Sequence, residues 1–151
     1  MPVEEIMRDT TAFGGLALYC FVAVLFLLTG YVHVFAELVI GLALCYIIIA
    51  SIRTFWFRRR PDKQKFSGFF TKIDAGSFPS MHSARVTVLA IILAQFFTQP
   101  LVRALLALGV VAVIATRVML KRHYPSDVIG GIVLGTLIGW ITPMAATALM
   151  G

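Results

Sequence analysis

Charged residues are scarce in this sequence, at 13% of 151 residues, whereas hydrophobic residues make up 60%. So little charge excludes an intrinsically disordered chain, and no polar segment is long enough to fold around a core of its own. The sequence also shows no internal repeat, no low-complexity tract and no nucleic-acid-binding motif. This composition is typical of an integral membrane protein.

Alternation of apolar and polar residues, the mark of a membrane strand, is also missing. Instead, five apolar runs are long enough to cross about 30 Å of hydrocarbon as helices. They cover residues 12–32, 34–52, 83–98, 101–120 and 128–150. The third run is the shortest, so we expect its helix to begin upstream, at Pro79 or Ser80. The sequence predicts an all-α integral membrane bundle with about five transmembrane helices, in which residues 1–151 form a single domain.

Cysteines are few as well. Cys20 and Cys45 both lie inside apolar runs, where a small buried thiol is expected. They predict neither a disulfide nor a metal site. The acidic residues Glu4, Glu5 and Asp9 precede the first run, and we expect that run to be retained rather than cleaved as a signal peptide.

The few charges are distributed unequally across the membrane. Each span reverses the direction of the chain, so the N-terminus, residues 53–80 and residues 121–127 share one side. Of the 13 basic residues, all except Arg103 lie on or near that side. Two explanations stay open, namely the excess of lysine and arginine in cytoplasmic loops and an anion-binding site built from several loops. From the loop charges we expect a multi-pass cell-membrane protein whose basic side faces the cytoplasm.

Polar side chains gather where the predicted spans end on this basic side. Arg53 and Arg60 are about two helical turns apart, so they share a face if the second helix continues as far as Pro61. The other spans contribute a hydroxyl, two imidazoles, a third guanidinium and a carboxylate. Such a set of groups suits an anion. These groups belong to Ser80, His82, His123, Arg117 and Asp127.

Three segments match a known family in order and in spacing. RTFWFRRRP at 53–61, PSMH at 79–82 and TRVMLKRHYPSD at 116–127 resemble the signature motifs of the type 2 phosphatidic acid phosphatase superfamily. Those motifs read Lys-x6-Arg-Pro, Pro-Ser-Gly-His and Ser-Arg-x5-His-x3-Asp. In this chain Arg53 stands for the lysine, Met81 for the glycine and Thr116 for the serine. Membrane members of the family usually have six spans, one more than we expect here.

The resemblance implies a phosphatase with divided roles. His123 would attack phosphorus and form a phosphohistidine, Asp127 would hold the other ring nitrogen of His123, and His82 would serve as general acid and base. For Arg85, contact with the substrate and a role outside the site both stay open. The groups expected to bind phosphate are the side chains of Arg53, Arg60, Ser80 and Arg117 and the backbone N–H of Met81.

We therefore expect metal-independent hydrolysis of a lipid phosphate or diphosphate, with no cofactor and no nucleic-acid partner. The acidic residues of the basic side lack the spacing of metal ligands. Two alternatives stay open, namely a phosphotransferase or lipid-remodelling enzyme with the same intermediate and a non-enzymatic binder or transporter of lipid phosphates.

Three further features carry expectations about packing. Gly131, Gly135 and Gly139 recur every four residues, which predicts either close packing inside the bundle, against the fourth span, or a homodimer face. Residues 66–73 predict a short amphipathic helix on the membrane surface, in contact with membrane lipids. His33, with Glu37 nearby, is expected to be an interfacial residue outside the site, and Arg58, Arg59 and Arg103 are expected to be interfacial cations.

Overall fold

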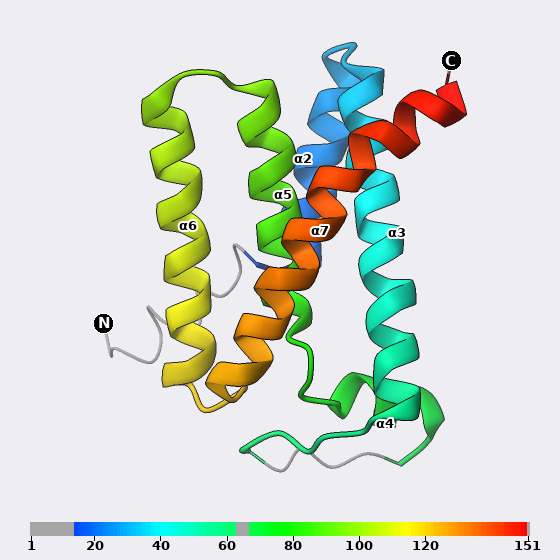
Figure 1. The fold of residues 1–151 in the computed structure, drawn as a ribbon, viewed down its shortest axis with the longest axis vertical. Helices are drawn as coiled ribbons and strands as arrows, with labels where there is room; N and C mark the ends of the chain where they lie inside the picture. The colour runs from blue at the N-terminus through cyan, green and yellow to red at the C-terminus, as the bar shows by residue number, and fades with distance from the viewer. Residues whose placement is uncertain (1–13, 63–66, 151) are drawn as a thin grey trace.

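The chain forms a bundle of apolar helices in the computed structural model, which describes residues 14–62 and 67–150 (Figure 1). α2 (Leu16–Leu28) and α3 (Val32–Phe55) form one hairpin, and α5 (Met81–Phe96) and α6 (Pro100–Met119) form another. α7 (Pro125–Met150) crosses in front of α5, and the short α4 (Phe69–Ala75) lies at one end of the bundle. The described residues contain helices and one isolated bridge, between Arg59 and Gly76, which confirms the predicted all-α fold.

Three of these helices, α3, α6 and α7, are long and apolar enough to cross a membrane. α2 and α5 are apolar but shorter, with 13 and 16 residues. At 1.5 Å per residue they reach about 20 and 24 Å, less than a hydrocarbon core of about 30 Å. The described residues therefore form an all-helical bundle with three helices able to span a membrane, and the number of five spans stays a prediction.

The first helix is shorter than its apolar run. α2 ends at Leu28, where Thr29 donates its backbone N–H to the Leu25 carbonyl and Gly30 follows with a φ of 86°. This left-handed backbone suits glycine and stops the helix. α5, which corresponds to the third predicted span, begins at Met81 with Ser80 as its N-cap. α7, which corresponds to the fifth, begins at Pro125, and both starts are close to the expected positions.

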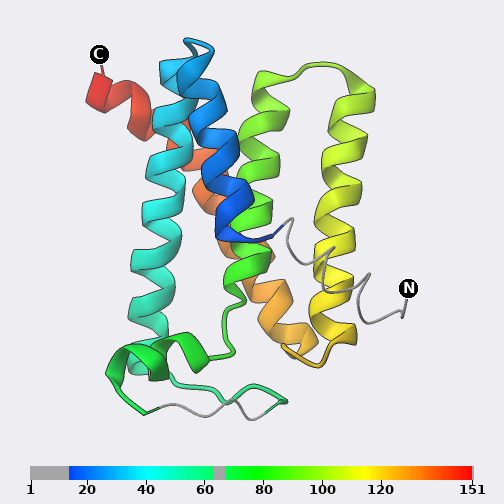
Figure 2. The same cartoon turned by 180° about the vertical axis from the view of Figure 1, so that it is seen from behind.

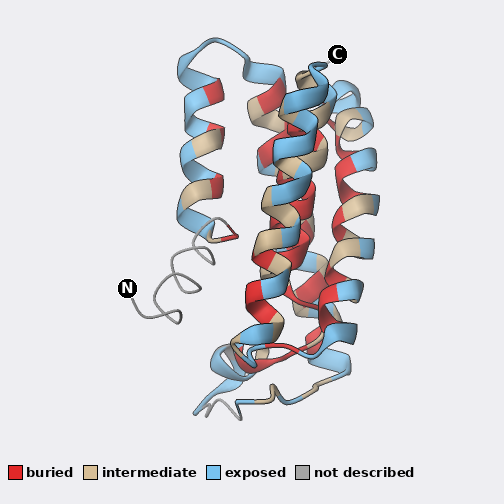
Figure 3. Cartoon of the chain, turned by 90° about the vertical axis from the view of Figure 1, so that its left-hand side faces the viewer, coloured by how far each residue is buried: buried red, intermediate tan, exposed pale blue. Residues whose placement is uncertain are grey.

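α5 is the central helix and contacts α2, α3, α6 and α7. Its buried residues Val88 and Ile92 belong to a core that includes Tyr19 of α2 and Leu38 of α3. Large apolar side chains such as Leu101 face outward, and Figure 3 shows buried residues along the inside of the bundle with exposed ones around it. Outward apolar side chains are the normal surface of a helix bundle in lipid.

The glycines of α7 pack against α5. A Cβ placed on Gly131 would lie 2.5 Å from the Ser80 carbonyl oxygen, and one on Gly135 would lie 2.6 Å from the Ala84 carbonyl oxygen. Gly139 lies in the same way against Ile91. The small-residue face therefore packs within the bundle, although against α5 rather than against the fourth span as expected. All three glycines are buried in the bundle, and a homodimer of this chain stays a prediction.

Arg60 does not continue α3, so the expectation that Arg53 and Arg60 share a helical face was wrong. The helix ends at Phe55, and the ring of Trp56 then packs 5.7 Å from that of Phe78. Residues 58–59 run antiparallel to residues 76–77, with a 2.8 Å hydrogen bond from the Ser77 N–H to the Arg58 carbonyl. Spacing along one segment could not show this pairing with a segment far along the chain.

The predicted surface helix is present in part. α4 begins at Phe69, after Gly68 as N-cap, and lies at the same end of the bundle as the close of α3 (Figure 2). Lys72 of α4 places its Nζ 5.3 Å from the ring centre of Phe57. Phe66, with which the predicted helix began, lies outside the described residues, as do Lys63 and Lys65.

Candidate active site

The residues of the three motifs meet at one end of the bundle. Arg53 lies in the last turn of α3 and Arg117 in the last turn of α6. Asp127 lies in the first turn of α7, while Ser80 and His82 lie at the start of α5. The ends of α3 and α6 and the starts of α5 and α7 all lie at the same end of the bundle (Figure 1). Antiparallel packing thus brings together residues that are up to 74 positions apart in the sequence.

His123 lies between α6 and α7 and is 2% exposed. Its backbone N–H donates to the Arg117 carbonyl at 3.2 Å, and its Nδ1 lies 2.9 Å from the Ser77 carbonyl oxygen. Because a carbonyl only accepts, Nδ1 carries the proton and Nε2 keeps its lone pair. Nε2 is buried and has no hydrogen-bond partner.

The ring of His123 is neutral at ordinary pH. Burial and then the positive charges of Arg60, Arg117 and Arg53 lower its pKa from 6.5 to about 3. A neutral imidazole with a free Nε2 has the electronic form that a nucleophile or a proton acceptor requires.

Asp127 is fully buried and has several donors around it. Its Oδ1 accepts from Arg58 Nη1 at 2.8 Å, and its Oδ2 accepts from the Tyr124 N–H at 2.9 Å and from the hydroxyl of Ser77. The bond to Tyr124 is the one an acidic residue makes back to an N-cap, so it also fixes the start of α7. The distance from Oδ2 to Nδ1 of His123 is 3.8 Å, so Asp127 acts on that ring through its charge.

Arg58 was expected to be an interfacial cation, but it forms part of the site. It pairs with Asp127, donates to the Ser126 hydroxyl at 2.8 Å and stacks its guanidinium 4.2 Å from the ring centre of Tyr124. Its carbonyl accepts from Ser77, as described above. A buried carboxylate such as that of Asp127 needs more than one hydrogen-bond donor. This requirement could have indicated from the sequence that another arginine of the first motif, Arg58, contacts it.

Ser77 is the second residue that the motifs did not indicate. Its hydroxyl donates to Asp127 and its carbonyl accepts from His123, so one residue joins the two. Ser77 is buried and stands three positions before Ser80. Nothing in the local sequence distinguishes it from other loop serines.

Arg53 holds the loop that leads into α5. Nη1 donates to the Ile73 carbonyl at 3.1 Å, and Nη2 donates to the Pro79 carbonyl at 2.8 Å. The planar fork of arginine bridges the two carbonyls with a fixed geometry, which the compact ammonium of lysine lacks. Nε of Arg53 is buried without a partner. Arg60 donates to the Asp74 carbonyl at 2.7 Å, so both arginines contact the same loop.

Arg117 and Arg85 are buried as well, and Nε of each has no partner. Arg85 donates through Nη1 to the Tyr46 hydroxyl at 3.0 Å and through Nη2 to the Gly14 carbonyl at 2.9 Å. Its hydrogen bonds therefore run to α3 and to the segment before α2.

The start of α5 offers donors to the site. Ser80 is fully buried, and its Oγ accepts from the hydroxyl of Ser83 at 3.0 Å. Its backbone N–H donates to the Asp127 carbonyl at 2.9 Å, which joins α5 to α7. The N–H groups of Met81 and His82 open the helix and are not used by its ladder. Such a helix start favours an anion.

Positive charge exceeds negative charge at this buried end. Arg53 and Arg117 are buried and Arg60 is half-buried, whereas Asp127 is the buried carboxylate here and already pairs with Arg58. Buried charges are costly unless compensated, so the arrangement favours a bound anion. Among the described residues, no group of three or more His, Cys, Asp or Glu could hold a metal ion.

His33 and the cysteines lie apart from this site. His33 pairs with Glu37 at 2.8 Å, as expected of an interfacial residue. Cys20 and Cys45 are both free thiols; Cys45 is buried as expected, whereas Cys20 is exposed on the surface of the bundle. Arg103, in the first turn of α6, donates to the carbonyls of Ala94 and Phe97 at 3.0 and 3.1 Å. The start of α6 lies at the opposite end of the bundle (Figure 1).

Comparison with known proteins gives a family, curated relatives and a fold. A sequence model of the PAP2 superfamily matches residues 37–149. Decaprenylphosphoryl-5-phosphoribose phosphatase, from two strains of Mycobacterium tuberculosis, is 31% identical over 101 residues, which are 67% of this chain and 55% of the relative. The chain thus spans about half the length of these curated relatives. The crystal structure of Aquifex aeolicus LpxE superposes with a TM-score of 0.78 at 20% identity, over 94% of this chain and 86% of that one.

Proposed function

The chain belongs to the PAP2 superfamily, and from this membership we propose that it is a membrane phosphatase that hydrolyses a lipid phosphate or diphosphate without a metal ion. The observation that carries the proposal is the buried Nε2 of His123, which has no hydrogen-bond partner and lies near Arg53 and Arg117, two buried arginines whose Nε groups also have none. A phosphate monoester brings the missing negative charge and an electrophilic phosphorus. A simple anion binder would need the arginines but not an unprotonated Nε2.

Phosphate would bind through the arginines and the start of α5. The free Nε groups of Arg53 and Arg117 would donate to its oxygens, and the N–H groups of Met81 and His82 would add neutral donors. We place Arg60 and the hydroxyl of Ser80 in the same set. These donors neutralise the phosphate charge that would otherwise repel a nucleophile.

In the first step, Nε2 of His123 attacks phosphorus and the bond to the lipid oxygen breaks. His82 gives a proton to that leaving oxygen, so the lipid departs as an alcohol. The imidazole becomes positively charged, while Nδ1–H keeps its bond to the Ser77 carbonyl and Asp127 lies 3.8 Å away to offset the charge. The bound dianion favours the protonated form of His82 before this step.

In the second step, water attacks the phosphohistidine. His82, now neutral, takes a proton from the water, the N–P bond breaks and inorganic phosphate leaves. His123 and His82 return to their starting protonation states. The same intermediate would pass its phosphate to an alcohol in a phosphotransferase, so the acceptor decides between the two activities.

The substrate belongs to a class of lipids with a terminal phosphate. Phosphatidic acid, a phosphatidylglycerophosphate-like lipid and polyprenyl phosphates all present this group. The name of the mycobacterial relative refers to a decaprenylphosphoryl-5-phosphoribose, so a polyprenyl-linked sugar phosphate belongs in the same panel. Release of inorganic phosphate from each lipid would rank them.

The test compares two histidine variants in detergent with a radiolabelled lipid phosphate. His123→Ala should form no phosphoenzyme, whereas His82→Ala should form it from a substrate with a good leaving group and then accumulate it. His33→Ala is the matched control, since His33 pairs with Glu37 away from the site, and it should behave as the wild type.

Other outcomes would contradict parts of the mechanism. A phosphoenzyme in His123→Ala would exclude this nucleophile, and full turnover by His82→Ala on an alkyl phosphate would exclude the acid–base role. Loss of activity in a chelator, restored by magnesium, would contradict the metal-free route. Vanadate should inhibit, because it adopts the five-coordinate geometry of phosphorus in transfer. A new phosphate ester in place of free phosphate would identify a transferase.

We also propose that all five apolar helices span the membrane, in a multi-pass cell-membrane protein whose site faces the cytoplasm. Basic residues concentrated at one end of the bundle support this orientation. A cysteine introduced at the exposed Lys72 should stay unlabelled by an impermeant thiol reagent in intact cells and react after lysis. Ready labelling in intact cells would reverse the orientation.

A further inference from the structure

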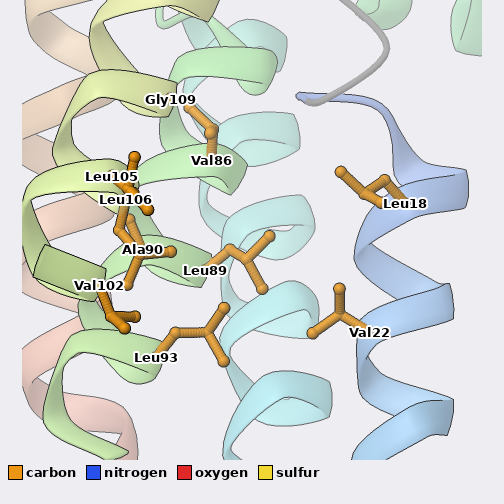
Figure 4. Close-up of a pocket in the computed structure, with 10 residues that line it drawn as sticks. All are labelled: Leu18, Val22, Val86, Leu89, Ala90, Leu93, Val102, Leu105, Leu106 and Gly109. Atoms are coloured by element: carbon orange, nitrogen blue, oxygen red, sulfur yellow. The ribbon is translucent and has the colours of Figure 1, made fainter. Parts of the chain in front are cut away.

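An apolar groove of about 330 Å³ lies between α2 and α6, with α5 as its floor (Figure 4). In Figure 4, Leu18 and Val22 of α2 face Leu89 and Leu93 of α5 across an open space. Every residue that lines the groove is apolar. They are Leu18, Val22, Val86, Leu89, Ala90, Leu93, Val102, Leu105, Leu106 and Gly109.

The groove stays open because of how its walls are built. α2 and α6 both contact α5, and residues of all three helices line the groove. Gly109 lies on the groove wall of α6, and a Cβ placed on it would meet nothing within 4 Å. Inside a membrane such a space is filled by hydrocarbon, because water has no polar partner there.

The groove leads toward the candidate active site. Val86, at its near end, is one helical turn beyond His82 on α5. Gly14 lies beside His82, since a Cβ placed on it would be 2.8 Å from Val113 Cγ1 and 3.5 Å from His82 Cβ. From Val86 to Leu93 the groove runs about 10 Å along α5.

We propose that this groove binds the hydrocarbon chain next to the phosphate of the substrate, which makes it the part of the protein that selects lipids by their chain. The proposal rests on the proposed phosphatase function. Acyl and polyprenyl chains extend into a bilayer from their headgroups, as the groove extends from the level of His82 into the bundle. A chain seated there would place its phosphate ester near the start of α5.

A second cavity, of about 460 Å³, lies on the other side of α6 and is less suited to this role. Thr87, Thr136 and Arg103 contribute to its lining, so part of its wall is polar. The all-apolar lining and the position of Val86, one helical turn from His82, favour the groove between α2 and α6.

The groove should act mainly on orientation. A lipid chain leaves surroundings that are already apolar, so it gains little from the hydrophobic effect when it enters the protein. What it gains is a fixed position for the ester beside His82 and His123. Filling the groove should therefore penalise long-chain substrates relative to short-chain ones.

The test uses Gly109→Leu, which places a side chain in the groove where no atom obstructs it. Ala104→Leu is the matched control, because Ala104 is an exposed residue of α6 that lines neither cavity. Phosphate release is measured in mixed micelles from a long-chain phosphatidic acid and from a short-chain, water-soluble one. The ratio of long-chain to short-chain kcat/KM should fall about tenfold in Gly109→Leu and stay unchanged in Ala104→Leu. An unchanged ratio in Gly109→Leu would overturn the proposal.

A labelling experiment separates this proposal from the proposed function. A long-chain phosphatidic acid with a photoreactive group in its chain near the glycerol should label Val86, Leu89 or Leu105 in the wild type and fail to do so in Gly109→Leu. Excess unlabelled phosphatidic acid should compete, and phosphatidylcholine should not. Equal competition by phosphatidylcholine would show a space filled by any membrane lipid and would overturn the proposal. If the wild type released no phosphate from any lipid of the panel, the proposed function would fail, and the labelling would still decide what the groove binds.

Discussion

α6 and α7 both pack against α5, but they do so in opposite ways. α7 brings Gly131, Gly135 and Gly139 against α5 at distances that leave no room for a side chain. α6 carries Gly109 on a wall that faces an open groove, and cavities lie on both of its sides. Glycine thus permits close packing on one helix and leaves space on the other.

The difference follows from what each helix carries. α7 carries Asp127, whose carboxylate accepts hydrogen bonds from Arg58 and Ser77. These bonds form only if α7 holds the carboxylate in a fixed position. The Ser80 N–H reaches the Asp127 carbonyl only because Gly131 lets the two helices approach. α6 presents Arg117 on a long flexible side chain, which tolerates a looser helix. α7, which carries the short side chain of Asp127, packs closely against α5. α6, which carries the long side chain of Arg117, packs more loosely and leaves room for the proposed lipid chain.

The largest effect should come from breaking the close packing. Gly135→Leu places atoms where the Ala84 carbonyl lies 2.6 Å from a Cβ, so α7 must move away from α5. We expect the free energy of unfolding to fall by about 3 kcal/mol and activity to fall on every substrate. The measurement is unfolding in mixed detergent with sodium dodecyl sulfate. The same change at Gly109 is the control, and equal destabilisation by the two would contradict the comparison.

A smaller effect should appear with pH at His123, where α6 and α7 join. The unfolded chain binds a proton at this histidine below pH 6.5, whereas the folded chain keeps the ring neutral down to a pKa of about 3. Stability from His123 is therefore present above pH 6.5 and is lost as the pH falls from there toward 3. At a pH of about 5 the loss should be about 2 kcal/mol relative to neutral pH.

The control for this prediction is His123→Gln, which removes the titrating ring. Unfolding is measured for the wild type and the variant at both pH values. The wild type should lose more stability than the variant between them. Parallel losses in the two proteins would mean that His123 does not titrate as its burial predicts.

The smallest effect should follow from Arg58→Gln, which removes the positively charged partner of Asp127. The side chain of Arg58 is 39% exposed whereas that of Asp127 is 0% exposed, so solvent weakens the pair from one side only. We expect kcat to fall about tenfold with little change in KM, since Arg58 positions Asp127 and does not contact phosphate. Arg58→Lys should recover part of the loss, and Arg59→Gln, at an exposed neighbour, should have no effect. A rise in KM without a change in kcat would assign Arg58 to substrate binding instead.

Much of the fold could be predicted from the sequence because lipid leaves the chain few choices. Apolar runs gave the helices, and four of the five began or ended within a few residues of the expected positions. The first run was misjudged at its end because hydropathy does not register the turn at Gly30. The partner of the α7 glycines was also misjudged, since a periodic pattern shows that a helix will approach closely but not which helix.

The sequence predicted which residues gather at the site better than it predicted the hydrogen bonds and ion pairs between them. Motif spacing placed Arg53, His82, His123 and Asp127 at one end because helix ends on the same side of a membrane must meet. The antiparallel pairing of residues 58–59 with 76–77 depends on long-range contacts, so neither the position of Arg60 nor the pair between Arg58 and Asp127 could be read from local spacing. The division of chemical roles between the histidines stays a prediction.

Arg53, Arg60 and His123 contact the loop before α5 through its backbone carbonyls. Arg53 and Arg60 donate to the carbonyls of Ile73, Asp74 and Pro79, and His123 contacts the carbonyl of Ser77. Every amino acid supplies the same carbonyl, so mutation of the side chains at 73, 74 and 79 leaves these acceptors in place. Changes of side chain at 73 and 74 can therefore leave the orientation of the histidine intact. The loop remains sensitive at Ser77, whose hydroxyl donates to Asp127, at Gly76, where a Cβ would lie 2.9 Å from Arg53 Cδ, and at Phe78, which packs against Trp56.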